Sequence, residues 1–314
     1  MNTLPLELHS QIFELACIDD GSTARSLSLV SRYVRSVVEP FLYQSLAVAG
    51  LSSMTELLAR LKQEPRHKRR VRRLFLSDWT RKQVEQRSVP ASDEDMDRYD
   101  LEKATIIHLL DLVAPTLQSL TVLVSCPFNS TQLIGHLFSL KFPHLRALTI
   151  HGFYPFPHVP DVMPAVECLH LSGNRNPYGL LQSGALDAAC PNLVHVRVSG
   201  LVSASSFAEE LAEAVLPASH PQKISPFMSR LPKNVSHIVV HPGPPPAKTR
   251  RYSTSLVQHE KMGERFKDLA QGTGSKPNVR FTLLEKNEDE VIYDMLRHEW
   301  AEDATFGRAH WTLV

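Results

Sequence analysis

Residues 190–198 read Cys-Pro-Asn-Leu-Val-His-Val-Arg-Val, and this stretch decides the fold. After the proline, apolar residues alternate with variable ones, which is the pattern of a β-strand with one buried face. Similar phrases occur at 114–122, 142–150 and 163–171. A looser copy, one residue longer, begins at Leu231, and a degenerate copy begins at Pro277. This recurrence predicts a series of similar strands.

The spacing of the copies indicates how these strands are connected. Their prolines lie at 115, 143, 164 and 191, so that 28, 21 and 27 residues separate successive copies. Apolar residues at helical spacing predict helices over 101–113, 132–140, 180–189, 207–216 and 256–269. Strand, helix, strand is the unit of a parallel sheet backed by helices. No such unit can bury its own apolar face, so the units are expected to stack.

A different pattern occupies residues 4–43, where we expect three short helices. Pro5 suits the first turn of the first helix, because its missing N–H is not needed there. One face of this helix carries Leu4, Leu8, Ile12 and Leu15. The polar run at 19–22 breaks the helix, and Ser31 is placed to cap the third one. A unit this small cannot bury all its apolar residues, so a docking face is expected.

Three motifs in this segment form a joint pattern: Leu4-Pro5-x-Glu7, Ile12-Phe13, and Leu-Ser-Leu-Val-Ser-Arg at 27–32. On these motifs, residues 3–46 resemble the F-box family, in particular its fungal form. The resemblance implies that the helices bind the Skp adaptor of a cullin-RING ubiquitin ligase. The docking residues it implies are Leu4, Pro5, Leu8, Ile12, Leu27, Leu29 and Val30.

The Cys190-Pro-Asn-Leu phrase is similar to the cysteine-containing leucine-rich repeats often found behind F-boxes. The expected fold is therefore α/β: a three-helix F-box, then an irregular leucine-rich-repeat-like α/β solenoid with a parallel sheet. The expected domains are the F-box at 1–46, a linker helix at 47–70 and the repeats at 71–314. A C-terminal helix around 291–300 is expected to cap the open end of the repeats. An unrelated α/β domain is the alternative.

Composition adds few constraints on function. The chain has 314 residues and a net charge of +1, so no overall field indicates a nucleic-acid or membrane partner. The four cysteines are far apart, which favours reduced thiols in the cytoplasm or nucleus. We expect no signal peptide, because the first residues continue directly into an amphipathic helix. No apolar run approaches the length of a membrane span.

Two further stretches, at 66–73 and 79–98, lie between the helical segment and the first proline phrase. The basic residues between 66 and 73 are either a nuclear-import or phosphate-binding patch, or solvated positions around a first strand. We favour the strand, because Val71, Leu74 and Leu76 continue the apolar alternation. The stretch 79–98 has few apolar anchors and predicts an exposed loop.

The variable positions of the repeats define a candidate recognition face. Stacking the phrases places Cys168, His195 and His237 in one row and His170, Arg197 and Val239 in the next, with His151 near them. The candidate substrate-binding residues are His151, His170, His195, Arg197 and His237. We expect them to be exposed and to bind acidic groups more tightly at lower pH. A zinc site is the alternative, but Arg197 disfavours it, so we predict no metal and no cofactor.

The sequence contains no Gly-rich phosphate loop, no His-Glu-x-x-His and no Gly-x-Ser-x-Gly motif, so we predict no catalytic residues. The F-box resemblance implies a substrate-recognition subunit of a Skp-cullin-F-box ubiquitin ligase. Its partners would be a Skp-type adaptor, a cullin reached through it, and a protein substrate. Such a subunit contributes proximity rather than chemistry. The alternatives are a scaffold that acts outside a ligase and an α/β enzyme with a helical cap.

Overall fold

The computed structural model describes residues 4–86, 93–182, 184–215, 229–246, 253–271, 279–285 and 291–306. Over these residues the chain is an α/β protein in which neighbouring strands pair in parallel. It divides into two compact units. The first unit comprises Met1–Asn129 with Val291–Leu313, and the second comprises Ser130–Glu290.

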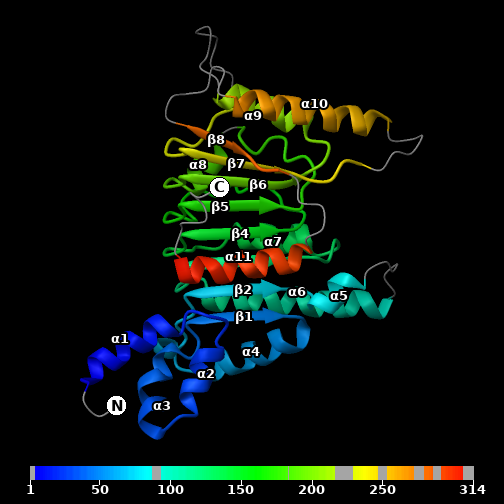
Figure 1. Cartoon of the computed structure of the whole chain (residues 1–314). Helices are drawn as coiled ribbons and strands as arrows, with labels where there is room; N and C mark the ends of the chain where they lie inside the picture. Colours follow the sequence, from blue (N-terminus) through cyan, green and yellow to red (C-terminus); the bar gives the residue numbers. More distant parts are fainter. Residues whose placement is uncertain are drawn as a thin grey trace. The chain divides into compact units, whose positions relative to one another are not determined.

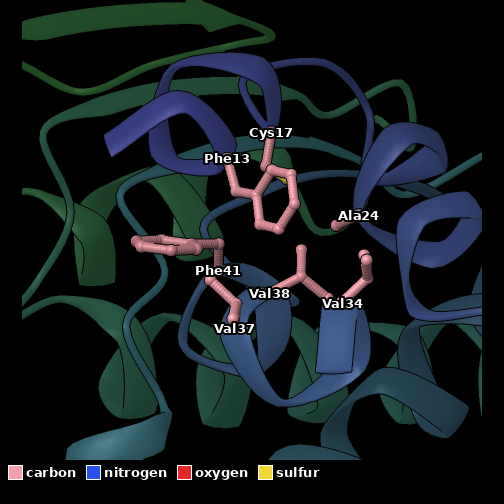
Figure 2. Close-up of a cluster of buried hydrophobic side chains, with 7 residues drawn as sticks. All are labelled: Phe13, Cys17, Ala24, Val34, Val37, Val38 and Phe41. Carbon is pink, nitrogen blue, oxygen red and sulfur yellow. The ribbon is translucent and has the colours of Figure 1, made fainter. Parts of the chain in front are cut away.

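Three short helices begin the first unit: α1 (Leu6–Ala16), α2 (Ser22–Ser28) and α3 (Arg32–Val38), followed by the 3₁₀ turn η1 (Glu39–Phe41). Their inward faces meet in a small core made of Phe13, Cys17, Ala24, Val34, Val37, Val38 and Phe41. Figure 2 shows these side chains pointing towards one another from the three helices and the turn. The core leaves the opposite face of α1 uncovered.

Side-chain caps separate these helices. The Asp19 carboxylate accepts hydrogen bonds from the Gly21 and Thr23 N–H groups, both at 3.0 Å, and from the Ser22 and Thr23 hydroxyls. Burial works to raise the pKa of Asp19, but these hydrogen bonds outweigh it and lower the pKa. The Ser31 hydroxyl accepts from the Val34 N–H at 3.1 Å and caps α3, as predicted.

The strands β1 (Ser45–Ala49), β2 (Arg73–Ser77) and β3 (Ser119–Leu123) pair in that order. The helical segments of this part are α4 (Leu51–Gln63), η2 (Arg66–Lys68), α5 (Arg81–Glu85) and α6 (Asp93–Val113). The prediction of an exposed loop over 79–98 is corrected for the described residues, where α5 and the start of α6 replace a loop and Trp79 is buried. Residues 87–92 lie outside the described part, but Trp79 and Tyr99 are buried and stack at 6.2 Å. These two aromatic rings anchor the start of α6.

Several of the basic residues between 66 and 73 form ion pairs or hydrogen bonds within the first unit. Lys68 pairs with Glu39 at 2.7 Å, and Arg72 pairs with Glu14 on α1. The Arg69 guanidinium donates to the Glu64 carbonyl at 2.6 Å. The predicted strand is present as β2, which covers Leu74 and Leu76, but it begins only at Arg73 and is the second strand, after β1. Residues 66–68 form the turn η2 instead, so the expectation of solvated positions around a first strand is corrected for this stretch.

The last helix, α11 (Ile292–Phe306), packs against β1–β3, the strands of the first unit, which we call the first sheet (Figure 1). Leu296 and Trp300 form a buried cluster with Phe75 and Leu123, and the Arg73 guanidinium donates to the Trp300 carbonyl at 2.6 Å. We expected this helix to close the open end of the repeats, and that expectation is corrected. Phe75 places a large apolar ring on one face of β2, and α11 is the element that removes it from water.

The second unit contains five strands among its described residues: β4 (Ala147–His151), β5 (Cys168–Ser172), β6 (His195–Leu201), β7 (His237–Pro242) and β8 (Arg280–Leu283). Its described helices are α7 (Ser130–Leu137), α8 (Ala185–Ala189), α9 (Ser205–Val215) and α10 (Ser253–Ala270). Each strand pairs in parallel with the next one in sequence. Cys168 faces His195, and His195 faces His237, so the predicted register is confirmed.

The proline phrase also supplies hydrogen bonds between successive turns. The Asn192 side chain donates to the Pro164 carbonyl at 2.8 Å, and Asn234 donates to the Pro191 carbonyl at 2.9 Å. Each asparagine thus bonds to the proline of the preceding phrase. These side chains satisfy carbonyls at the point where the chain enters each strand, which stabilises the stacking of the turns.

A column of glycines occupies the other end of the strands. Gly152, Gly173 and Gly243 directly follow β4, β5 and β7, while Gly200 lies within β6. Gly173 has a φ of +94°, and a Cβ there would lie 2.6 Å from the Gly152 carbonyl oxygen. A Cβ on Gly243 would lie 3.1 Å from the carbonyl carbon of Gly200. The turns approach this closely because these residues lack side chains.

We predict that Gly173→Ala destabilises the protein, because the left-handed backbone alone costs about 1–3 kcal/mol. The matched control is Gly263→Ala within α10, where a Cβ meets nothing within 4 Å. That substitution should stabilise by about 0.5–1 kcal/mol, the helix propensity difference. Urea unfolding of both variants checks this. Equal midpoints for the two alanine variants would contradict the close packing of the glycine column.

Candidate functional site

The three-helix segment exposes a set of large apolar side chains, which we call the N-terminal apolar surface. Its members are Leu4, Leu6, Leu8, Ile12, Leu15, Leu29 and Val30. Leu29 and Leu15 are the most exposed, at 78% and 74%. Soluble proteins seldom leave apolar groups together in water unless they form a binding surface.

The positions of these residues follow from the small core beneath them. His9 and Phe13 turn inwards from α1, and the His9 Nδ1 atom lies 2.8 Å from the Tyr33 hydroxyl oxygen on α3. The core takes one face of α1 and leaves the stripe through Leu8 and Ile12 in solvent.

The predicted docking residues lie mainly on this surface. Leu4, Pro5, Leu8, Ile12, Leu29 and Val30 are all exposed. Leu27 differs, because it is half-buried and packs against the small core. Leu6 is exposed as well, but the sequence pattern did not predict it, because Leu6 lies outside the stripe formed by Leu4, Leu8 and Ile12. Tyr33 on α3 is also 46% exposed. Only its contact with His9 in the structure identifies it as a neighbour of this surface.

The second candidate site is the row of polar residues on β4 to β7. The structure brings these residues together in the predicted register, with His170 facing Arg197. Their expected exposure was wrong: His170 is fully buried and Arg197 is only 9% exposed. His151, His195 and His237 are half-buried. The apolar partners Leu148, Leu169 and Val196 are buried, as predicted.

Hydrogen bonds between neighbouring strands hold this row in place. The His151 Nδ1 atom lies 2.9 Å from the Ser172 hydroxyl oxygen, and the His170 Nε2 atom lies 2.8 Å from that of Ser199. Side chains directly opposite each other on parallel strands are about 5 Å apart, so they cover one another. The alternation of the strand indicates the face of each residue but not how deeply its neighbours bury it.

The electrostatics of the row oppose the expected response to acid. Burial lowers the pKa of His151 to about 4. Burial also lowers the pKa of His195, and the His237 ring, stacked on it at 4.6 Å, adds to this effect. His151 therefore stays neutral at pH 6, and His195 is shifted in the same direction. Tighter binding on mild acidification is no longer expected from these two imidazoles.

The thiols of the described residues are buried and form no disulfide bonds with one another. Cys17, Cys126, Cys168 and Cys190 are buried free thiols. Burial raises the pKa of Cys17 to about 11 and that of Cys190 to about 12. Within the described residues, no three His, Cys, Asp or Glu side chains are grouped to hold a metal ion. None of the helices in this part of the chain is long and apolar enough to cross a bilayer.

No protein-family model, curated protein or solved structure compared with this chain matches it. The resemblance to the F-box therefore stays a prediction that depends on the motifs at 4–13 and 27–32. Of the apolar residues in those motifs, Leu4, Ile12, Leu29 and Val30 are exposed, whereas Phe13 belongs to the buried core.

The shifted pKa of His151 predicts a dependence of stability on pH. An imidazole in the unfolded chain titrates near 6.5, so between about pH 6.5 and 4 only the unfolded state binds the proton. Stability from this group is complete above that window and is lost as the pH falls through it. His151→Asn, which cannot titrate, should lose less stability between about pH 7.5 and pH 5 than the wild type.

Thermal melting at these two pH values measures the effect. His158→Asn is the matched control, because this imidazole is exposed, and it should keep the wild-type dependence. A melting temperature that responds to pH identically in wild type and His151→Asn would refute the assignment.

Proposed function

We propose that this chain is an F-box protein and the substrate-recognition subunit of a Skp-cullin-F-box ubiquitin ligase in the cytoplasm or nucleus. The N-terminal apolar surface would bind the Skp-type adaptor. The second unit would act as a leucine-rich-repeat-like solenoid that binds a protein substrate. The observation that carries the proposal is the exposure of Leu8, Ile12, Leu29 and Val30 beside a closed three-helix core.

The size of the surface is adequate for such a partner. Burying one Leu or Ile side chain contributes about 1.5–3 kcal/mol. Association costs an estimated 4–15 kcal/mol in lost freedom of motion, so one or two anchors are too few. Seven large apolar side chains on one short helical segment are enough to offset that cost.

The helices are also held firmly to the first sheet, which favours a positioning role. Arg297 on α11 contacts Asp20 at 3.0 Å, and the Gln44 side chain donates to the Glu14 carbonyl at 2.9 Å. The Ser45 hydroxyl donates to the Ile18 carbonyl at 3.0 Å. A partner on the three helices would have a fixed orientation relative to β1–β3. Fixed orientation is what proximity catalysis by other subunits requires.

The repeat features support the second half of the proposal. The strands follow one another in sequence order, and the asparagine and glycine residues recur at their two ends. Such stacks usually present extended surfaces to polypeptides rather than deep pockets for small molecules. We assign the chain no catalytic step. The ubiquitin-conjugating enzyme would supply the chemistry.

We predict that Leu8→Ser combined with Ile12→Ser abolishes binding of a Skp-type adaptor. Both side chains are exposed, at 43% and 48%, so their loss should affect binding without unfolding the helices. Pull-down of purified adaptor measures this. Val257→Ser, a change at another exposed apolar residue, is the matched control and should bind normally.

Adding the cullin to the same pull-down separates the ligase from the scaffold. Recovery of adaptor and cullin together supports a ligase subunit, whereas recovery of adaptor alone supports the scaffold. Full adaptor binding by the folded double variant would exclude the N-terminal apolar surface as the docking site.

A further inference from the structure

Two loops at the carboxyl ends of β4 and β5 carry exposed aromatic side chains. Phe153 and Tyr178 are 59% and 55% exposed. We define the aromatic rim as Phe153, Phe156, His158, Arg175 and Tyr178. The segments 152–160 and 173–182 of these loops contain no Asp or Glu, and the first carboxylate after β4 is the exposed Asp161. Among the described residues, no carboxylate forms an ion pair with Arg175 or His158, which are both exposed.

Hydrogen bonds to neighbouring helices hold both loops in place. The Phe153 N–H donates to the Ser130 hydroxyl at 2.6 Å, and the Thr131 hydroxyl donates to the Phe153 carbonyl at 3.2 Å. The Gly179 and Leu181 N–H groups each donate at 2.7 Å to the Glu210 carboxylate. Glu210 is 2% exposed, so these are buried charge-assisted bonds. Such ordering lowers the entropy cost of binding to the loops.

The two loops form one surface. A Cβ on Gly179 would lie 3.2 Å from the Phe156 ring, so this ring packs directly against the residue next to Tyr178. Gly152 and Gly173, at the base of the loops, are also in close contact. The exposed rings and the Arg175 guanidinium therefore belong to adjacent turns.

We propose that the aromatic rim binds an acidic segment of a protein partner. Exposed aromatic rings on ordered backbone are the usual anchors of protein interfaces, and the exposed Arg175 guanidinium beside them favours an acidic side chain on the partner. The buried row of His170 and Arg197 is not available for this role in the described structure. Naming this partner as the ligase substrate rests on the proposed function, but the binding itself does not.

A single-stranded nucleic acid is the other ligand that aromatic and cationic groups attract. Such ligands are bound along continuous basic grooves that follow many phosphates. The aromatic rim carries one arginine, one histidine and no lysine. A peptide therefore fits this surface better than a nucleic acid does.

The test is selection of a random peptide library, displayed on phage, against the full chain. The enriched peptides should be rich in Asp and Glu and contain apolar or aromatic residues. Phe153→Ser combined with Tyr178→Ser should weaken a selected peptide about tenfold or more, measured by fluorescence anisotropy. Arg175→Glu should reduce the preference for acidic peptides. The matched controls are Val257→Ser and Arg280→Glu, both exposed positions elsewhere in the second unit.

Each outcome decides the proposal. The proposal would be overturned by selected peptides that show no preference for Asp and Glu. It would also be overturned if the peptides were not enriched on the wild type over the rim variants, or if they bound the rim and control variants with equal affinity. Competition by a single-stranded oligonucleotide at equal strength would assign the surface to nucleic acid instead. Binding of a Skp-type adaptor is measured on the same variants. If neither the wild type nor the variants bind the adaptor, the proposed function is refuted and the peptide result still stands.

Discussion

The constraint on which the structure of the second unit depends is the close stacking of one turn on the next. Parallel strands lie about 4.8 Å apart, which leaves no room for side chains where the loops of adjacent turns approach each other. Positions 152 and 173 are therefore glycines. The same spacing forces the polar residues of neighbouring strands into contact. His170 and Ser199 therefore bond to each other, and the row becomes a packed polar layer. What remains accessible is the loop edge, where Phe153 and Tyr178 project.

The three N-terminal helices face the opposite problem. Their shared core contains seven buried apolar residues among those described, and one face of α1 has nothing within its own segment to cover it. The ion pair between Glu14 and Arg72 and the bond from Gln44 fix the polar side of this segment to the sheet. The segment is therefore anchored on one side and apolar on the other. That asymmetry makes it a rigid element with a surface suited to a partner.

Sequence reasoning succeeded where a local pattern had one physical solution. The proline phrase predicted the register of Cys168, His195 and His237, because alternation and spacing together leave little freedom. It missed β1, which carries no such phrase, and it misplaced α11, because periodicity identifies a helix but not the sheet it covers. The burial of Arg197 was not predicted, because the alternation of a strand indicates the face of a residue but not how deeply its neighbours cover it. The glycines that directly follow β4, β5 and β7 are visible in the sequence and mark how closely the turns stack.

The position of α11 has a consequence for synthesis of the chain. Phe75 and Leu123 are made early, but the helix that buries them begins at Ile292, more than half of the chain later. At about 5–20 residues per second, the ribosome needs roughly 8–34 s to bridge that interval. During this time the apolar face of the first sheet is uncovered and open to chaperones. A chain terminated before Ile292 would keep that face exposed permanently, which distinguishes an incomplete product from a finished one.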